Sequence, residues 1–308
     1  MKAIYKHIET VFAVLILSAS GFAINAQTLP SLMLDQDPAS LALGMSGVAS
    51  HSGAFAIQNN VAAISLSEKT LDAQAVFGIW QPSYSNLKTM GAGVVYRMGK
   101  LGFGVDVKML KLQSYNGISG NGSDIRDSEF SPREINLAAG ASYAVMDCLS
   151  AGVTLRYTSS NLAVDASAAV FGADIALYYS KEALSAGISI NNIGTKVKYS
   201  ETSYPQPMMA KIGAGYDIDF GPSSIAFTAE ADVIFAGGIM AGAGCEYAFK
   251  DMVYARAGYH YGNSVNAVPS YVSVGLGLNI FGAQLNFAYL FASPVLANTM
   301  SVSLGYSF

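Results

Sequence analysis

Hydrophobic and polar residues alternate with a period of two along most of the chain after residue 68. Segments of about ten alternating residues, bounded by turn residues, are typical of strands with one apolar and one polar face. Fourteen strands are predicted, over residues 69–80, 88–98, 101–111, 133–145, 149–159, 168–179, 183–191, 208–218, 224–235, 239–249, 252–261, 270–280, 283–292 and 298–308. The last strand places Met300, Val302, Leu304, Tyr306 and Phe308 on one apolar face.

The connections between these strands alternate in length. Short turns are predicted at residues 99–100, 146–148, 180–182, 219–223, 250–251 and 281–282, whereas the other connections include long polar loops over residues 112–132 and 192–207. This asymmetry and the even strand count are typical of outer-membrane barrels, with short periplasmic turns and longer extracellular loops. A soluble β-sandwich, the alternative for any single strand, does not require either feature.

Charged residues are distributed by face in the predicted strands. A lysine or arginine on the lipid face costs about 2–4 kcal/mol at the midplane, and charges with that parity, such as Lys88, Lys111 and Arg133, lie only at strand ends. The charges assigned to the lumen are Asp72, Arg97, Asp106, Lys108, Glu134, Arg156, Asp174, Lys211, Asp217, Glu230, Asp232, Glu246 and Arg256.

Five of these residues are predicted to form a lumenal polar network: Lys211, Glu230, Asp232, Glu246 and Arg256. The turn at residues 250–251 sets Glu246 opposite Arg256, and the turn at residues 221–222 brings Lys211 near Glu230. We interpret the network first as ion pairs that fill the barrel; a substrate-binding role is the alternative.

Tyrosines recur at one level of the predicted barrel. They lie on the lipid face near the ends of strands that precede short turns, where amphipathic rings favour the membrane interface. The predicted periplasmic girdle consists of Tyr96, Tyr143, Tyr179, Tyr216, Tyr247 and Tyr306.

The N-terminus has the pattern of a cleaved signal peptide. Lys2 and Lys6 precede an apolar run over residues 11–17 and small residues up to Ala26. Cleavage is predicted after Ala26, with Ala23 as the alternative. The run is too short for a bilayer, which needs about 20 apolar residues, so an inner-membrane anchor is disfavoured and export is expected.

Composition supports a membrane barrel. Hydrophobic residues make up 52% of the chain and charged residues 12%, against about 25% charged residues in soluble domains. An exported hydrophobic chain without a long apolar run favours a closed barrel, because lipid requires every backbone polar group to be paired internally. The formal charge of −4 makes nucleic acid an unexpected partner.

Residues 27–68 lack the strand pattern and are broken at Asp37-Pro38, Gly44, Gly47 and Asn59-Asn60. The segment leads directly into the first strand, and a barrel of fourteen strands is wide enough to hold it. The predicted organisation is a signal peptide (1–26), an N-terminal plug segment (27–68) and an antiparallel transmembrane β-barrel (69–308). A short periplasmic tail is the alternative for the second part.

The sequence contains no recognisable catalytic, metal or cofactor site. The histidines are His7, His51 and His260, and they have no metal-ligand spacing. We therefore expect a non-enzymatic protein without a cofactor. Cys148 and Cys245 are predicted to be isolated thiols, with a disulfide as the alternative.

Several stretches resemble a known family. Residues 37–49, 191–194, 207–216, 244–247 and 256–259 are similar, in this order, to the PorV/PorQ family of Bacteroidetes-type bacteria, within the FadL-type superfamily. Asn60-Val61-Ala62 departs from the Asn-Pro-Ala that is usual there. The resemblance implies a FadL-like barrel in the outer membrane, in contact with its lipid. The terminal Tyr306 and Phe308 also resemble the signal by which barrel insertion machinery recognises such proteins.

The resemblance further implies an accessory or docking component of type IX protein secretion, with secretion-complex proteins as partners. Extracellular loops would be the working surfaces, and the candidate partner residues are Asp124, Arg126, Asp127, Glu129, Arg133, Tyr204 and Pro205.

Two alternatives remain open. The first is FadL-like passive uptake of small hydrophobic compounds through the barrel wall, for which Gly213, Gly215, Gly242 and Gly244 would permit a kink. The second is a purely structural barrel. Lumenal positions are mostly Gly, Ser, Asn and charged residues, which weighs against the first alternative.

Overall fold

The computed structural model describes residues 29–50, 53–82, 86–118, 124–163, 166–199, 202–263, 266–293 and 295–308. The predicted signal peptide, residues 1–26, lies outside the described residues. None of the helices in the described ranges is long and apolar enough to cross a membrane.

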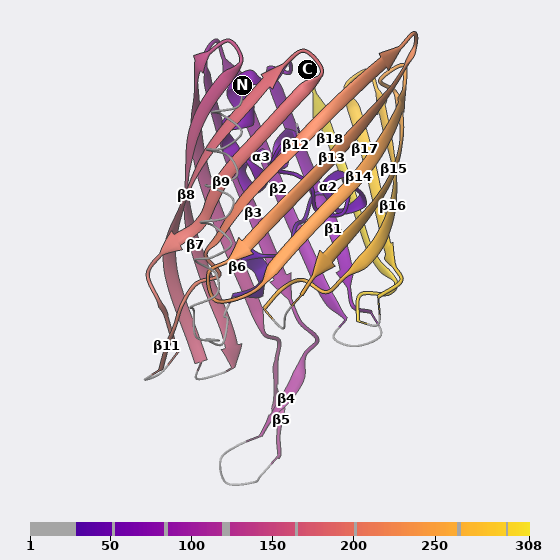
Figure 1. Ribbon diagram of the computed structural model, residues 1–308. Helices are drawn as coiled ribbons and strands as arrows, with labels where there is room; N and C mark the ends of the chain where they lie inside the picture. Colours follow the sequence, from indigo (N-terminus) through magenta and orange to yellow (C-terminus); the bar gives the residue numbers. More distant parts are fainter. Residues whose placement is uncertain are drawn as a thin grey trace.

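Fourteen antiparallel strands close into a barrel (Figure 1). They are β1 (Leu71–Trp80), β2 (Leu87–Met98), β3 (Leu101–Lys111), β6 (Arg133–Met146), β7 (Leu149–Ala163), β8 (Ala166–Lys181), β9 (Leu184–Gly194), β12 (Met209–Phe220), β13 (Ser223–Ile234), β14 (Ile239–Phe249), β15 (Val253–Gly262), β16 (Tyr271–Ile280), β17 (Ala283–Phe291) and β18 (Thr299–Ser307). All fourteen correspond to predicted strands, which confirms the predicted fold class.

The connections give the barrel two different ends (Figure 1). Tight turns such as Gly99-Lys100 and Phe281-Gly282 lie at one end, together with the C-terminus, and we call this the short-turn end. The opposite, long-loop end carries two hairpins outside the barrel sheet, β4 (Tyr115–Ile118) with β5 (Asp124–Phe130), and β10 (Val197–Tyr199) with β11 (Thr202–Tyr204).

These hairpins correct the sequence analysis, which expected loops over residues 112–132 and 192–207. Each contains paired strands of only three to seven residues, too short to give a clear period-two signal. β9 also extends to Gly194, three residues beyond its predicted end.

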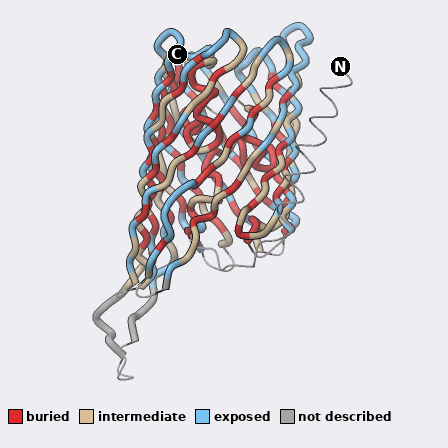
Figure 2. The backbone as a smooth tube through the Cα atoms, turned by 60° about the vertical axis from the view of Figure 1, so that its left-hand side comes forward, coloured by how far each residue is buried: buried red, intermediate tan, exposed pale blue. Residues whose placement is uncertain are grey.

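The two faces of the wall differ in burial along nearly every strand (Figure 2). Residues of β3 alternate between exposed and buried almost throughout, so that Val105 faces outward and Asp106 inward. Lys88, Lys111 and Arg133 are exposed at strand ends. The face assignment by parity is therefore correct.

Main-chain hydrogen bonds from the last residue complete the closure of the barrel. β1 pairs with β18 from Asp72–Ser307 to Ile79–Met300. The Phe308 carbonyl oxygen accepts bonds from the amides of Thr70 (2.7 Å) and Leu71 (3.0 Å). The terminal strand is thus fully used in pairing, and the first and last strands leave no open edge.

The segment before β1 lies inside the barrel and is built from short turns of helix. They are η2 (Pro30–Leu32), α2 (Pro38–Ala42), η3 (Gly53–Phe55), α3 (Ala56–Asn59) and η4 (Val61–Leu66). Asp37 caps α2, with its side chain accepting from the Ala39 amide and Pro38 in the first helical turn. Asn60 caps η4 in the same way, so Val61 occupies the position of the family's usual proline without breaking the turn. These residues form the plug, as predicted.

Three apolar clusters hold the plug in the lumen, and the smallest joins Leu29 to Val170 of β8 and Val197 of β10. At the long-loop end, Leu41 and Met45 of the plug pack with Trp80, Tyr271 and Leu290 of the wall. At the short-turn end, the α3–η4 region packs against β2, β6 and β8, with Ile57 and Ile64 among the buried residues. The cluster around Leu41 and Met45 lies in the long-loop half of the lumen, and the α3–η4 cluster lies on one side of the short-turn half.

Candidate functional site

The predicted polar network forms around Lys211 on one side of the lumen. The Lys211 Nζ lies 3.1 Å from Glu230 Oε1 and 3.8 Å from Asp232 Oδ2. The second oxygen of Glu230 accepts the Val48 amide of the plug at 2.7 Å. The pair expected between Lys211 and Glu230 is therefore present, and it also fastens the plug.

The second expected pair lies across the turn between β14 and β15. Glu246 is directly opposite Arg256, as the register requires, and accepts a hydrogen bond from Arg256 Nε. Arg256 Nη1 donates to Asn286 Oδ1 at 2.9 Å, and the guanidinium carbon lies 5.2 Å from the centre of the Tyr254 ring. Both expected pairs thus bridge neighbouring wall strands.

A third charged group, which the predicted network did not include, binds the plug from β7 and β3. Arg156 Nη2 forms a 2.6 Å ion pair with Asp174 and donates to the Ile57 carbonyl of the plug at 2.8 Å. Asp106 accepts from Gln36 (2.7 Å) and Gln58 (2.5 Å), both in the plug. The sequence placed these charged residues on the lumenal face of their strands by parity. It did not predict their partners in the plug, because the plug has no periodic pattern.

A bulge in β9 supplies another anchor. The pairing of β8 with β9 shifts between Ala173 and Ile175, where Asn191 and Asn192 occupy the extra length of β9. Asn192 adopts φ 61°, and its amide donates to Asp174 Oδ1 at 2.8 Å. This stretch, one of those that resemble the family, thus has a defined structural role next to Arg156.

Glycines in the wall admit the plug backbone. A Cβ on Gly242 would overlap the carbonyl oxygen of Gly44, and one on Gly244 would meet Leu43. β12 and β14 pair continuously with both neighbours, without a register shift. The glycines of these strands provide close approach to the plug, and the kink suggested for Gly213, Gly215, Gly242 and Gly244 stays a prediction.

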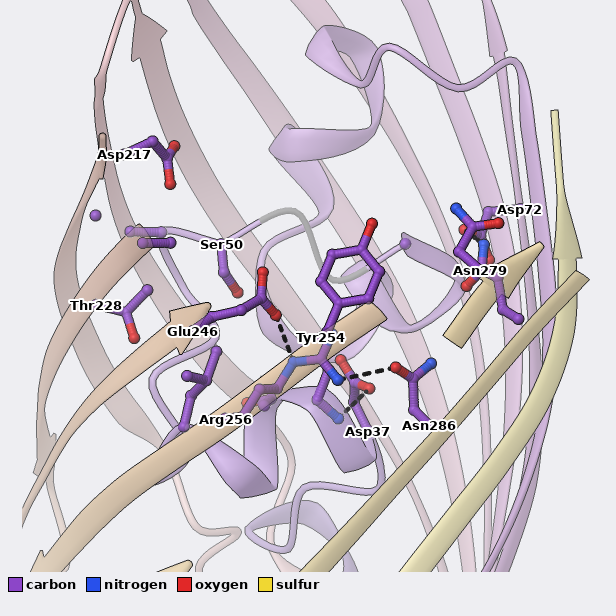
Figure 3. A pocket seen from close by; sticks show the side chains of 18 of the residues that line it. Asp37, Ser50, Asp72, Asp217, Thr228, Glu246, Tyr254, Arg256, Asn279 and Asn286 are labelled. Carbon is purple, nitrogen blue, oxygen red and sulfur yellow. Dashed lines mark hydrogen bonds and ion pairs between the residues drawn. The ribbon is translucent and has the colours of Figure 1, made fainter. Parts of the chain in front are cut away.

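A polar cavity of about 250 Å³ remains beside the plug (Figure 3). Its wall residues come from the halves of β1, β9 and β12–β17 next to the short turns, including Asp217, Tyr254 and Gln284. Asp37 and Ser50 line it from the plug side. The cavity therefore belongs to the short-turn half of the lumen.

Asp37, which lines the cavity from the plug, has a shifted pKa. The residue is 2% exposed. Burial, with a further contribution from the nearby Asp35 carboxylate, raises the pKa of Asp37 to about 7. One oxygen caps α2, while Oδ2 is buried without a hydrogen-bond partner.

The candidate partner residues lie at the long-loop end. Asp124, Arg126, Asp127 and Glu129 belong to the β5 strand of the first hairpin. Arg133 is exposed at the start of β6. Tyr204 ends β11, and Tyr204 and Pro205 are both half-buried. The structure thus brings both groups to the same end of the barrel, on or directly beside two separate hairpins.

The aromatic residues expected at the membrane interface lie at the short-turn ends of their strands. Tyr179 is half-buried and the other five are exposed, namely Tyr96, Tyr143, Tyr216, Tyr247 and Tyr306. The Tyr306 and Phe308 rings lie 6.3 Å apart at the C-terminus. Their roles as a girdle and an insertion signal stay predictions.

The remaining reactive residues have structural surroundings. Cys148 and Cys245 are both free thiols. His260 faces the lumen, where its ring stacks on Tyr271 and its Nδ1 lies 3.1 Å from the Gly44 carbonyl oxygen. Among the described residues, no group of three His, Cys, Asp or Glu is placed to hold a metal ion.

Solved structures with the same barrel include two toluene transporters. TbuX of Ralstonia pickettii is 15% identical, with a TM-score of 0.60, over 88% of this chain and 97% of TbuX. TodX of Pseudomonas putida is 16% identical, with a TM-score of 0.59, over 92% of this chain and 99% of TodX. At this identity the likeness establishes the FadL-like fold alone. No curated protein sequence matches the chain.

A family model described as type IX secretion system protein PorV matches residues 20–236. The match spans the whole plug and the wall as far as β13, and so includes both hairpins. Together with the barrel, it indicates a location in the outer membrane. The resemblance noted in the sequence is thereby confirmed, and the chain belongs to the PorV family of type IX secretion system proteins.

Proposed function

We propose that this protein is a non-enzymatic accessory or docking component of type IX secretion, which binds partner proteins through the β4–β5 and β10–β11 hairpins. The observation that carries the proposal is the plug, which is anchored to several wall strands inside the lumen. Arg156, Asp106 and Glu230 hold the plug from different strands, and an apolar cluster occupies the long-loop half. The two hairpins extend away from the barrel at the long-loop end (Figure 1).

The composition of the first hairpin supports a protein partner. Residues 124–129 read Asp-Ile-Arg-Asp-Ser-Glu, with three acidic residues and one basic residue. A polar, charged surface of this kind suits reversible recognition by a complementary protein surface, where charge governs specificity and association rate. The hairpin form also limits the ordering that binding requires.

The test removes the hairpin while keeping the barrel. Residues 113–131 are replaced by a short Gly-Ser turn between β3 and β6, and a second variant carries Tyr204→Ala and Pro205→Ala. The control variant, Lys250→Ala with Asp251→Ala, changes the turn between β14 and β15 at the opposite end. Native-membrane affinity purification and mass spectrometry of secreted proteins provide the readouts, with heat-modifiable migration on gels as the check of barrel folding.

We expect the hairpin variants to insert normally but to lose a stoichiometric partner and to reduce the amount of secreted proteins. The turn variant should retain both. Normal secretion and no partner for any form of the protein would overturn the proposal.

A second candidate is passive uptake of small hydrophobic compounds, and one feature favours it. Tyr254 and Leu278 border the lumenal cavity and also an apolar groove of about 280 Å³ on the outer face of β15–β17. The charged lining of the cavity weighs against it. Toluene uptake by cells that lack the protein, compared with complemented cells, separates the two: reduced uptake with unchanged secretion favours this candidate.

A further inference from the structure

The cavity at the short-turn end has an excess of negative charge. Its acidic and basic lining groups are four carboxylates, the Lys69 ammonium and the Arg256 guanidinium. Arg256 is committed to Glu246 and Asn286, and Lys69 lies 3.2 Å from Asp72. This pairing leaves Asp37 and Asp217 without a basic partner among the lining residues.

Asp37 is the group that points to a ligand. It lines the cavity, the residue is 98% buried, and its Oδ2 has no hydrogen-bond donor. A buried carboxylate oxygen without a donor is unfavourable, because it has lost water and gained nothing in return. Figure 3 shows Asp37 beside Arg256 and Asn286, with Asp217 on a separate strand across the opening.

Asp37 Oδ2 therefore lacks a hydrogen bond from a positively charged N–H donor. An anion would face the two unpaired carboxylates, and the Arg256 guanidinium is already engaged by Glu246 and Asn286. An apolar ligand would leave Asp37 unsatisfied. At about 250 Å³, the space is close to the lower limit of small-molecule sites, about 300 Å³, and suits one side chain or one small amine.

We propose that this cavity binds a single ammonium or guanidinium group that enters from the short-turn end, with Asp37 as its deepest contact and Asp217 at the mouth. Two sources share this chemistry: a lysine or arginine side chain of a polypeptide, and a free polyamine. The site lies at the opposite end from the hairpins, so it is independent of the proposed function.

The proposal is tested by calorimetric titration of the full chain in lipid nanodiscs at pH 8, above the pKa of about 7 of Asp37, where its carboxylate is charged. The probes are N-acetyl-arginine methylamide, its neutral analogue N-acetyl-citrulline methylamide, and spermidine. Asp37→Asn is the main variant, because asparagine caps a helix as well as aspartate does and removes only the charge. Asp217→Asn is the second variant, and Asp219→Asn is the matched control, since Asp219 lies on the same strand and does not line the cavity.

We expect a cationic probe to bind and the citrulline analogue not to bind. Asp37→Asn should weaken binding by about 10- to 100-fold, as for loss of a charged hydrogen bond. Asp217→Asn should weaken it by a few fold, and Asp219→Asn should leave it unchanged. Tighter binding of the arginine probe supports a polypeptide as the source, and tighter binding of spermidine supports a free amine.

Three results would overturn the proposal: no binding of either cationic probe at millimolar concentration, equal binding of the citrulline analogue, or equal effects of Asp37→Asn and Asp219→Asn. If Asp37→Asn fails to give the heat-modifiable folded form, the comparison of Asp217→Asn with Asp219→Asn decides, and equal affinities of these two variants count against the site.

Discussion

Lys211→Met is the sharpest test of the lumenal network. The substitution removes the positive charge that lies 3.1 Å from Glu230 and 3.8 Å from Asp232. The side chains of Lys211, Glu230 and Asp232 are only 10%, 1% and 4% exposed, respectively. Both carboxylates would then be left buried without their counter-charge, and Glu230 also holds the Val48 amide of the plug.

The expected loss of stability follows from this burial. Breaking a buried ion pair by removing one partner costs about 3–5 kcal/mol, because the remaining charge is uncompensated. At roughly 2–4 °C per kcal/mol for a chain of this size class, the midpoint of thermal unfolding should fall by roughly 6–20 °C. Methionine keeps the length and apolar stem of lysine, so lost packing contributes little.

The assay is the temperature at which the folded, fast-migrating band disappears from SDS gels, checked by loss of the circular dichroism signal of the strands. Lys181→Met, at the exposed end of β8, is the control and should unfold at the same temperature as the wild-type protein. The triple variant Lys211→Met, Glu230→Gln, Asp232→Asn should regain most of the loss, because no unpaired charge remains. A single variant within about 2 °C of wild type, or a triple variant as unstable as the single one, would refute the reasoning.

Two further predictions concern the plug. Gly242→Val should displace the plug, because even a Cβ would overlap the Gly44 carbonyl oxygen. The expected result is higher ion conductance in planar bilayers, and Ala255→Val on the outer face is the control that should leave conductance unchanged. Equal conductance of Gly242→Val and wild type would argue against the packing described. Burial and the nearby Asp35 raise the pKa of Asp37 from 3.8 to about 7; Asp72 adds to this rise and Arg256 opposes it. The Asp37 carboxyl group therefore binds its proton more tightly in the folded state than in the unfolded state. Stability should therefore fall as pH rises from about 4 to 7, by up to about 1.4 kcal/mol per pH unit. Asp37→Asn should flatten this slope in unfolding titrations, and an identical pH profile would contradict the assignment.

The sequence by itself determined the wall of this barrel. Lipid outside and a polar lumen inside impose a strict alternation of apolar and polar residues. The number of strands and the face on which each side chain lies could therefore be predicted from this period of two. Tight turns then fixed the register locally, which is why the pairing of Glu246 with Arg256 was predictable from a turn between them. A family resemblance, rather than any single motif, supplied the expectation about secretion.

Only the tertiary structure decided how the lumen is filled. The plug has no period, its helices span three to six residues, and its contacts join residues far apart, such as Gln36 with Asp106 and Ile57 with Arg156. The glycines of β12 and β14 acquired their role from the backbone they face, which no local pattern encodes. The cavity around Asp37 likewise exists because the plug packs against one side of the short-turn half and leaves the other open. The alternation of apolar and polar residues is a local consequence of lipid on one face of the wall and a polar lumen on the other. The packing of the plug depends on contacts between residues far apart in the sequence. For that reason only the alternation could be predicted from the sequence.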